Sequence, residues 1–326
     1  MRTLTDGVAT GLAVLSTVLV VAPLVAVFIY LIYRGASSLS WDFFTQIPKP
    51  VGEAGGGMAN AIVGSAILLA VGSLIGIPVG IAGGIFLAEY GRGTKFANAI
   101  RFTADVLNGV PSIVMGIAVY SLLVVPKFVF SHRILSRYVF HLPNYISHHF
   151  ASITHFLHIP AEITLGPIAF SFSIGGHFSA LSGGVALGIM MIPTVCRTTE
   201  EMLLMVPNAV REAALALGVP NWRSVLAITV RTASPGIITG CMLAFARVAG
   251  ETAPLIFTAF GNVGWSMRLN EPIAALPLQI YVYALSPYDE WHRLAWAGAL
   301  VLIVLIVLAV SLVRYVTSRG VLKGAS

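Results

Sequence analysis

Residues 58–88 read MANAIVGSAILLAVGSLIGIPVGIAGGIFLA and contain no charged side chain. A helix needs about 20 apolar residues to cross the hydrocarbon core of a bilayer, and this run is longer than that. Gly76 and Pro78 lie inside the run, and a proline removes a backbone donor, so a kink or a break is expected near them. The stretch therefore predicts a membrane-spanning helix.

The composition of the whole chain agrees with this prediction. Over 326 residues, 57% are hydrophobic and 10% are charged, with a mean hydropathy of +0.89. A soluble domain carries about 25% charged residues, so a pair of soluble domains is excluded. The net charge of +6 would suggest nucleic acid in a soluble protein, but in a membrane protein it first indicates Lys and Arg in cytoplasmic loops. Cys196 and Cys241 lie in apolar stretches and give no disulfide or metal spacing.

Six apolar runs of this kind predict six spans. They cover residues 8–33, 58–88, 106–126, 181–196, 234–257 and 294–313. The first is too long for the core of a signal peptide, so we expect it to be retained. The expected fold is an all-α polytopic membrane protein, a single transmembrane domain over residues 1–326.

An even number of spans places both termini on one side of the membrane. If that side is the cytoplasm, the inner segments hold 11 Lys and Arg and the outer ones hold 7. Cytoplasmic loops carry the excess of Lys and Arg, so this bias favours cytoplasmic termini.

Four glycines follow one another at a spacing of four residues through the second run. They are Gly72, Gly76, Gly80 and Gly84. Residues four apart share one face of a helix, and small residues let a second helix approach closely. We expect this face to pack against another helix; a pore-lining role is the alternative, which the glycines themselves do not indicate.

Residues 197–231, between the fourth and fifth spans, form a cytoplasmic loop with helix signals of its own. Residues 207–218, PNAVREAALALG, begin with Pro207 and end with Gly218, which predicts a short helix. A second short helix is expected to begin at Asn221, a residue favoured at the N-cap. Such a pair is suited either to docking in a groove on another protein or to lying at the membrane interface, and periodicity does not separate the two.

This loop resembles the E-A-A loop of ABC-importer permeases. The likeness rests on Glu212, Ala213 and Ala214, followed by Gly218 and Ile228; Val230 and Arg231 depart from the usual ending. Longer stretches resemble the phosphate-specific permeases of ABC importers, the PstA branch above all. These stretches are residues 110–114, 211–218, 247–255 and 286–299, and the likeness extends from the first span to residue 126 and from about residue 181 to the C-terminal tail.

The resemblance implies a fold, partners and a place for the energy source. In the family, a type I permease of the bacterial inner membrane works with a second permease (PstC-like here), a cytoplasmic ATPase dimer and a periplasmic phosphate-binding protein. The residues that would couple to the ATPase are Glu212, Ala213, Ala214 and Gly218. The sequence has no G-x-x-x-x-G-K-[ST] loop, so ATP and Mg²⁺ are expected on the partner, with no cofactor and no enzyme activity in this chain.

Arg247 and Glu251 are charged residues inside the fifth run. Their spacing of four would place them on one face of a continuous helix. A charge near the bilayer centre costs about 2.5–3.5 kcal/mol, so such residues face a bundle interior or an aqueous path. They are candidates for the phosphate pathway, because a guanidinium matches phosphate oxygens; a mutual ion pair is the alternative. Asp105 and Asn108 are weaker candidates, expected to cap a helix or contact a neighbouring loop.

Residues 127–180 form a predicted outward-facing insertion to which the resemblance does not extend. Six of the eight histidines lie here: His132, His141, His148, His149, His155 and His158. His155 and His158 are three residues apart and could share a helix face, as zinc ligands do. Glu162 is the only acid nearby, so no metal site is predicted. The interleaved aromatic and aliphatic residues favour a segment at the outer membrane interface.

Three other functions were considered against phosphate import. A permease for sulfate, molybdate, phosphonate or another oxyanion would keep the Glu212 loop. An ion-coupled secondary transporter would be expected to show internal repeats and a chain of membrane carboxylates or histidines, which the sequence lacks. An intramembrane enzyme would need a nucleophile–base pair or a metal motif, and none accompanies Glu251.

Overall fold

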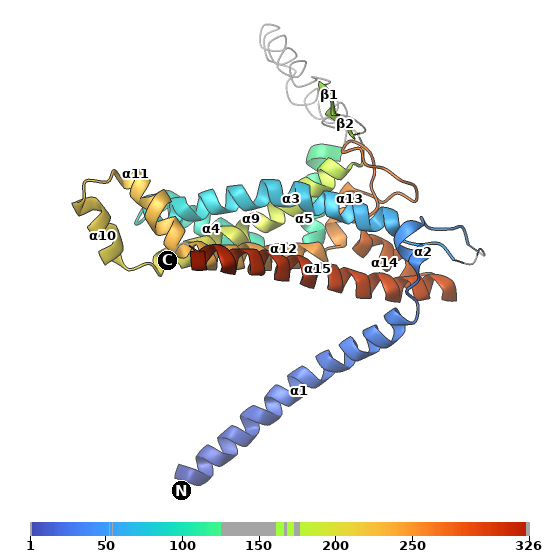
Figure 1. Cartoon of the computed structure of the whole chain (residues 1–326), viewed down its shortest axis with the longest axis horizontal. Helices are drawn as coiled ribbons and strands as arrows, with labels where there is room; N and C mark the ends of the chain where they lie inside the picture. Colours follow the sequence, from blue (N-terminus) through green and yellow to red (C-terminus); the bar gives the residue numbers. More distant parts are fainter. Residues whose placement is uncertain are drawn as a thin grey trace, which may run out of the picture.

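The computed structural model describes residues 2–51, 53, 55–124, 161–165, 168–172 and 177–323, and this part of the chain is almost entirely helical (Figure 1). In chain order, its elements are α1 (Arg2–Ala36), α2 (Trp41–Thr45), α3 (Ala59–Ile85), the π-helix η1 (Phe86–Tyr90), α4 (Lys95–Gly109), α5 (Ser112–Val119), the π-helix η2 (Tyr120–Val124), β1 (Ala161–Leu165), β2 (Ile168–Phe172), α9 (Ala180–Leu204), α10 (Asn208–Ala216), α11 (Asn221–Ser224), the π-helix η4 (Val225–Thr229), α12 (Val230–Ala249), α13 (Ala253–Thr258), α14 (Leu276–Ala284) and α15 (Asp289–Lys323). The predicted all-α class is confirmed for the membrane part.

Five of the described helices are long and apolar enough to cross a membrane. They are Ala9–Ala36, Ala59–Tyr90, Ala180–Leu204, Asn221–Ala249 and Asp289–Thr317. The sixth is a bent pair, Lys95–Gly109 with Ser112–Val124, whose halves meet at 108°. The predicted span over residues 106–126 is therefore not one continuous helix, and its first half begins earlier, at Lys95. Pro111 cannot donate a backbone hydrogen bond, and it pushes Val110 into extended geometry, at φ −69° and ψ 131°.

The second span does not break where its sequence suggested. α3 continues through Gly76 and Pro78 and passes directly into η1, so the helical run ends at Tyr90. Pro78 lies on the exposed face of α3, whereas the opposite face is held against α9. A single missing hydrogen bond on the exposed side therefore leaves the helix continuous.

The centre of the fold is the close pairing of α3 with α9. A Cβ atom added at Gly76 would lie 2.6 Å from the Gly188 carbonyl oxygen and 2.8 Å from Met191 Cβ. Gly72, Gly80 and Gly84 face residues of α9 in the same way. The backbones of these two helices thus approach without intervening side chains, which is how small residues pack membrane helices. Leu187, Met191 and Val195 of α9 belong to the main buried cluster.

Helix α1 leaves the bundle at a steep angle and meets it only near its C-terminal end (Figure 1). There, Gly35 lies against Trp296 and Leu300 of α15, and the rings of Tyr30 and Trp296 meet edge to face at 5.2 Å. The most apolar window of α1 has none of its residues buried. Apart from this contact near its C-terminal end, the apolar surface of α1 is therefore not covered by the residues that the structure describes.

The two ends of the bundle differ. α10, α11 and the C-terminus lie at one end of the long axis, and α2 and α14 lie toward the other (Figure 1). Within the predicted insertion, β1 and β2 form an antiparallel hairpin in which Ala161 pairs with Phe172 and Leu165 with Ile168. The six histidines predicted to characterise the insertion lie outside the described residues.

Candidate functional site

The loop between the fourth and fifth spans folds into two short helices, as its sequence predicted. α10 occupies residues Asn208–Ala216, and Gly218 ends the turn with a φ of 76°, a conformation that side chains disfavour. α11 begins at Asn221, but its N-cap is Pro220, so the cap assigned to Asn221 is shifted by one residue. Fixed φ makes proline suited to this entry position.

The surface of this loop is left open. Glu212 and Ala213 are exposed, Ala214 is buried, and Leu217 is 84% exposed. An acid beside exposed apolar side chains is typical of a surface that another protein covers. Periodicity left docking and interfacial placement open; the exposed Glu212 favours docking.

Arg211, one residue before Glu212, forms a buried ion pair that the sequence analysis missed. Its Nη2 lies 2.7 Å from Glu89 Oε1, and the two side chains are 13% and 7% exposed. Glu89 belongs to η1, at the end of the second span, 122 residues earlier in the chain. No local spacing connects such positions, so only the fold brings them together.

A second charge network joins α4 to α9. Arg101 Nε donates to Glu200 Oε1 at 2.6 Å, and Arg197 Nη1 lies 2.9 Å from Glu200 Oε2. Arg197 Nε lies 3.0 Å from Asp105 Oδ1. Asp105 therefore contacts a helix, not a loop as expected. The four charges balance, with two guanidinium groups and two carboxylates.

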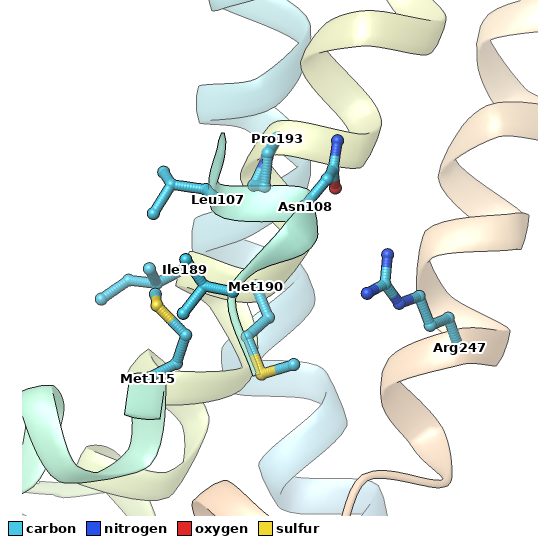
Figure 2. A pocket seen from close by; sticks show the side chains of 8 residues that line it. Leu107, Asn108, Met115, Ile189, Met190, Pro193 and Arg247 are labelled. Carbon is cyan, nitrogen blue, oxygen red and sulfur yellow. The ribbon is translucent and has the colours of Figure 1, made fainter. Parts of the chain in front are cut away.

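A narrow pocket lies at the bend between α4 and α5, where they face α9 and α12 (Figure 2). It has a volume of about 10 Å³, room for about one water molecule. The lining residues are Leu107, Asn108, Val110, Met115, Ile189, Met190, Pro193 and Arg247. The wall is therefore apolar except for Asn108 and Arg247.

Arg247 is the charged member of this lining. It lies in the last turn of α12, and its guanidinium extends toward the α4–α5 bend and α9 (Figure 2). Its side chain makes no hydrogen bond or ion pair with any residue that the structure describes. Its donors are therefore available to an anion.

Asn108 adds neutral donors to the same pocket. Its Oδ1 accepts a hydrogen bond from Thr194 Oγ1 of α9 at 3.1 Å. This bond fixes the amide, and its Nδ2 has no partner among the described residues. Asn108 was a weak candidate from sequence; the structure brings it to the pocket that Arg247 lines.

Arg247 and Glu251 do not lie on one helical face. α12 ends at Ala249, Gly250 leaves the helix at φ −95° and ψ 1°, and Glu251 lies in the break before α13. Pro254 at the start of α13 has no backbone donor to continue a single helix. The two side chains form no ion pair in this structure, so the alternative of mutual neutralisation is not observed.

The part of the chain that the structure describes holds no group of three or more His, Cys, Asp or Glu able to bind a metal ion. The candidate site consists of the pocket at Arg247 and Asn108, together with the loop around Glu212.

The chain is similar to known proteins over most of its length. The model of the family described as binding-protein-dependent transport system inner membrane component matches residues 80–320. The phosphate transport system permease protein PstA of Xylella fastidiosa is 43% identical over 278 residues, 85% of this chain and 80% of that protein. PstA of Haemophilus influenzae is 41% identical over 302 residues, 93% of this chain and 89% of that protein. The inward-facing MetNI methionine ABC transporter aligns with a TM-score of 0.49 and 16% identity, covering 82% of this chain and 96% of that one.

Proposed function

Since the chain belongs to the binding-protein-dependent transport system inner membrane components, we propose that it forms half of the translocation path for inorganic phosphate in an ATP-driven importer. The family confirms the resemblance to ABC-importer permeases and makes the chain a multi-pass transport subunit, with ATP hydrolysis on a separate protein. Phosphate as the cargo is supported by the relatives named for phosphate transport at 41–43% identity.

One observation carries the proposal: Arg247 reaches a membrane pocket with all its donors unused. A guanidinium offers planar forked donors that match phosphate oxygens, and Asn108 Nδ2 offers neutral donors at the same pocket. Arg101, Arg197 and Arg211 each pair with a carboxylate. Arg247 has no such partner among the described residues. Arg247 is therefore placed to meet a mobile anion.

The pocket is too small to hold phosphate in this structure. About 10 Å³ admits about one water molecule and no phosphate. Phosphate therefore does not fit between α9, α12 and the α4–α5 bend as they are arranged in this structure. Glu251, just beyond the end of α12, is proposed to keep anion binding weak, because a path must release what it binds.

The cytoplasmic loop is proposed to receive the force of ATP hydrolysis. The family implies an ATPase partner and a substrate-binding protein. We assign ATPase contact to Glu212, Ala213, Ala214 and Gly218, because α10 is a short helix whose outer face is open. Docking of such a helix in a groove is a recurrent mode of recognition.

The remaining partners follow from the exposed elements. A second, PstC-like permease is proposed to cover α1, whose apolar window has no buried residue. α10, α11 and the C-terminus share one end of the bundle (Figure 1), which we assign to the cytoplasm with both termini. The binding protein would then dock on the opposite side, where residues 127–180 are expected.

The test is uptake by the complete complex in liposomes of bacterial lipid. The chain is purified with its second permease and ATPase, and radiolabelled phosphate uptake is measured with and without ATP and the binding protein. We expect uptake to require both ATP and the binding protein. Excess sulfate, molybdate or phosphonate should not reduce it. Competition by one of these anions at equal concentration would replace phosphate as cargo, and uptake driven by an ion gradient alone would contradict an ATP-driven importer.

A further inference from the structure

Arg211 has every donor of its guanidinium occupied. Nε and Nη2 hold the Glu89 carboxylate, with the shortest separation, Nη2 to Oε1, at 2.7 Å. Nη2 also donates to the Leu203 carbonyl at 2.7 Å. Nη1 donates to the Val206 carbonyl at 2.6 Å and to Asn208 Oδ1 at 3.3 Å. All five donors that a guanidinium possesses are therefore used.

These partners belong to three different elements. Asn208 begins α10, Leu203 lies in the last turn of α9, Val206 follows the end of that helix, and Glu89 lies in η1 at the end of α3. Carbonyls at the end of a helix lack partners within the helix, and a cation is favoured there. One side chain of the coupling helix thus binds the ends of both α3 and α9.

Beyond this junction, α3 and α9 are packed closely enough to move as one rigid unit. Their backbones touch along the glycine face, where a Cβ at Gly84 would lie 2.5 Å from Thr199 Cβ and one at Gly76 2.6 Å from the Gly188 oxygen. Packed interfaces of this kind move as units rather than deform. A displacement of α10 that reaches Arg211 would therefore move the pair together.

The same pair reaches the pocket. Ile189, Met190 and Pro193 of α9 form one of its walls, and Thr194 of α9 holds Asn108 across it. Arg101 and Glu200 attach α4 to α9 between this wall and the cytoplasmic junction. A continuous set of contacts therefore runs from Arg211 through α9 to the pocket that Arg247 lines.

We infer that Arg211 and Glu89 are positioning residues for energy coupling: their ion pair transmits movement of α10 to the α3–α9 pair and so to the transport pocket. This inference rests on the proposed function, since it assumes that an ATPase moves α10. A forked guanidinium–carboxylate pair fixes both distance and orientation, whereas a lysine at the same place offers a point charge on a flexible stem. The pair is also shielded from solvent, so salt screens it little.

The experiment measures phosphate transported per ATP hydrolysed by the full complex in liposomes. Glu89→Gln keeps the shape of the side chain and removes its charge, and Arg211→Lys keeps the charge and removes the fork. Each is expected to retain the ATPase on purification and to keep hydrolysing ATP, while the ratio of phosphate to ATP falls about fivefold or more, the lower range for coupling between sites. The double variant is expected to fall no further than either single one, because both remove the same link.

Arg92→Lys and Asp6→Asn serve as matched controls. Both side chains are exposed, and neither forms an ion pair with a residue that the structure describes. Both lie outside residues 197–231. Their ratio of phosphate to ATP is expected to equal that of the wild type.

Two results would overturn the inference. The first is an unchanged ratio of phosphate to ATP in Glu89→Gln and Arg211→Lys. The second is loss of assembly or of thermal stability in both variants while the complex that survives keeps an unchanged ratio. That second result would assign the pair a structural role alone. The cargo is tested separately by anion competition on the wild type. If another anion is transported, the same ratio measured with that anion still decides the role of the pair.

Discussion

The carboxylate of Glu200 joins two helices by accepting Arg101 Nε at 2.6 Å on Oε1. Its other oxygen accepts Arg197 Nη1 at 2.9 Å. The Glu200 side chain is 3% exposed, whereas those of the two arginines are 25% and 31% exposed. Glu200 is therefore the buried centre of the contact between α4 and α9.

Glu200→Gln is expected to destabilise the assembled permease. The amide keeps the size of the side chain but leaves the partly buried Arg101 guanidinium without an anion, and Arg197 keeps only Asp105. Breaking a fully buried pair costs about 3–5 kcal/mol, and partial exposure of the arginines lowers this to about 1–3 kcal/mol. Thermal unfolding of the purified complex measures the loss. Glu201→Gln, at the next and exposed position without an ion pair, is the control; equal shifts in both variants would contradict the role of Glu200.

The sequence predicted the elements of the fold better than their junctions. Long charge-free runs determine spans because lipid demands them, and five helices with one bent pair match the six predicted spans. The bend at Pro111 was missed because hydropathy measures composition and not direction. Gly250 and Pro254 indicate local unwinding after Ala249, but the spacing of Arg247 and Glu251 was interpreted as one face of a continuous helix, which is wrong.

The candidate site was predictable only in part. Arg247 and the Glu212 loop stand out because charges are rare in this chain. The partners of these regions did not stand out. Arg211 meets Glu89 across 122 residues, and Asn108 meets Thr194 across 86. Such contacts depend on how helices pack, and no local pattern encodes the register between α3, α4 and α9.

Gly76→Ala is expected to separate α3 from α9. The added methyl group would lie 2.6 Å from the Gly188 oxygen, a backbone atom that cannot rotate away. Overpacking of this kind costs about 1–3 kcal/mol. The temperature of thermal unfolding of the complex and its rate of ATP-dependent uptake are both expected to fall. Gly7→Ala, in α1 with no atom within 4 Å, should leave both unchanged; an unaffected Gly76→Ala complex would contradict the close approach of the helices.

We expect the choice of residue at position 218 to be limited by backbone conformation and not by steric contact. Its φ is 76°, yet no atom lies within 4 Å of an added Cβ. Gly218→Val should therefore strain the end of α10, at a cost of about 1–2 kcal/mol, whereas Gly218→Asn should be tolerated better, because asparagine adopts this conformation. Retention of the ATPase during purification and thermal unfolding measure the effect. Equal behaviour of the two variants would exclude a conformational requirement at this position.

Arg247 is expected to bind phosphate through the geometry of its guanidinium as well as its charge. Arg247→Lys keeps the charge in the pocket but replaces the planar fork by a single ammonium. Loss of one charge-assisted hydrogen bond costs about 1.5–3 kcal/mol, so uptake should fall about tenfold or more, and Arg247→Gln should lower it further. Initial rates of ATP-dependent phosphate uptake measure this, with assembly and ATPase retention checked on the same preparations. Arg314→Lys, an exposed arginine on α15 without an ion pair, is the control and should transport at the wild-type rate. Arg247 forms no hydrogen bond or ion pair with the residues that the structure describes, so a loss of uptake in a fully assembled complex would support a place on the path, and wild-type uptake by Arg247→Gln would remove this residue from it.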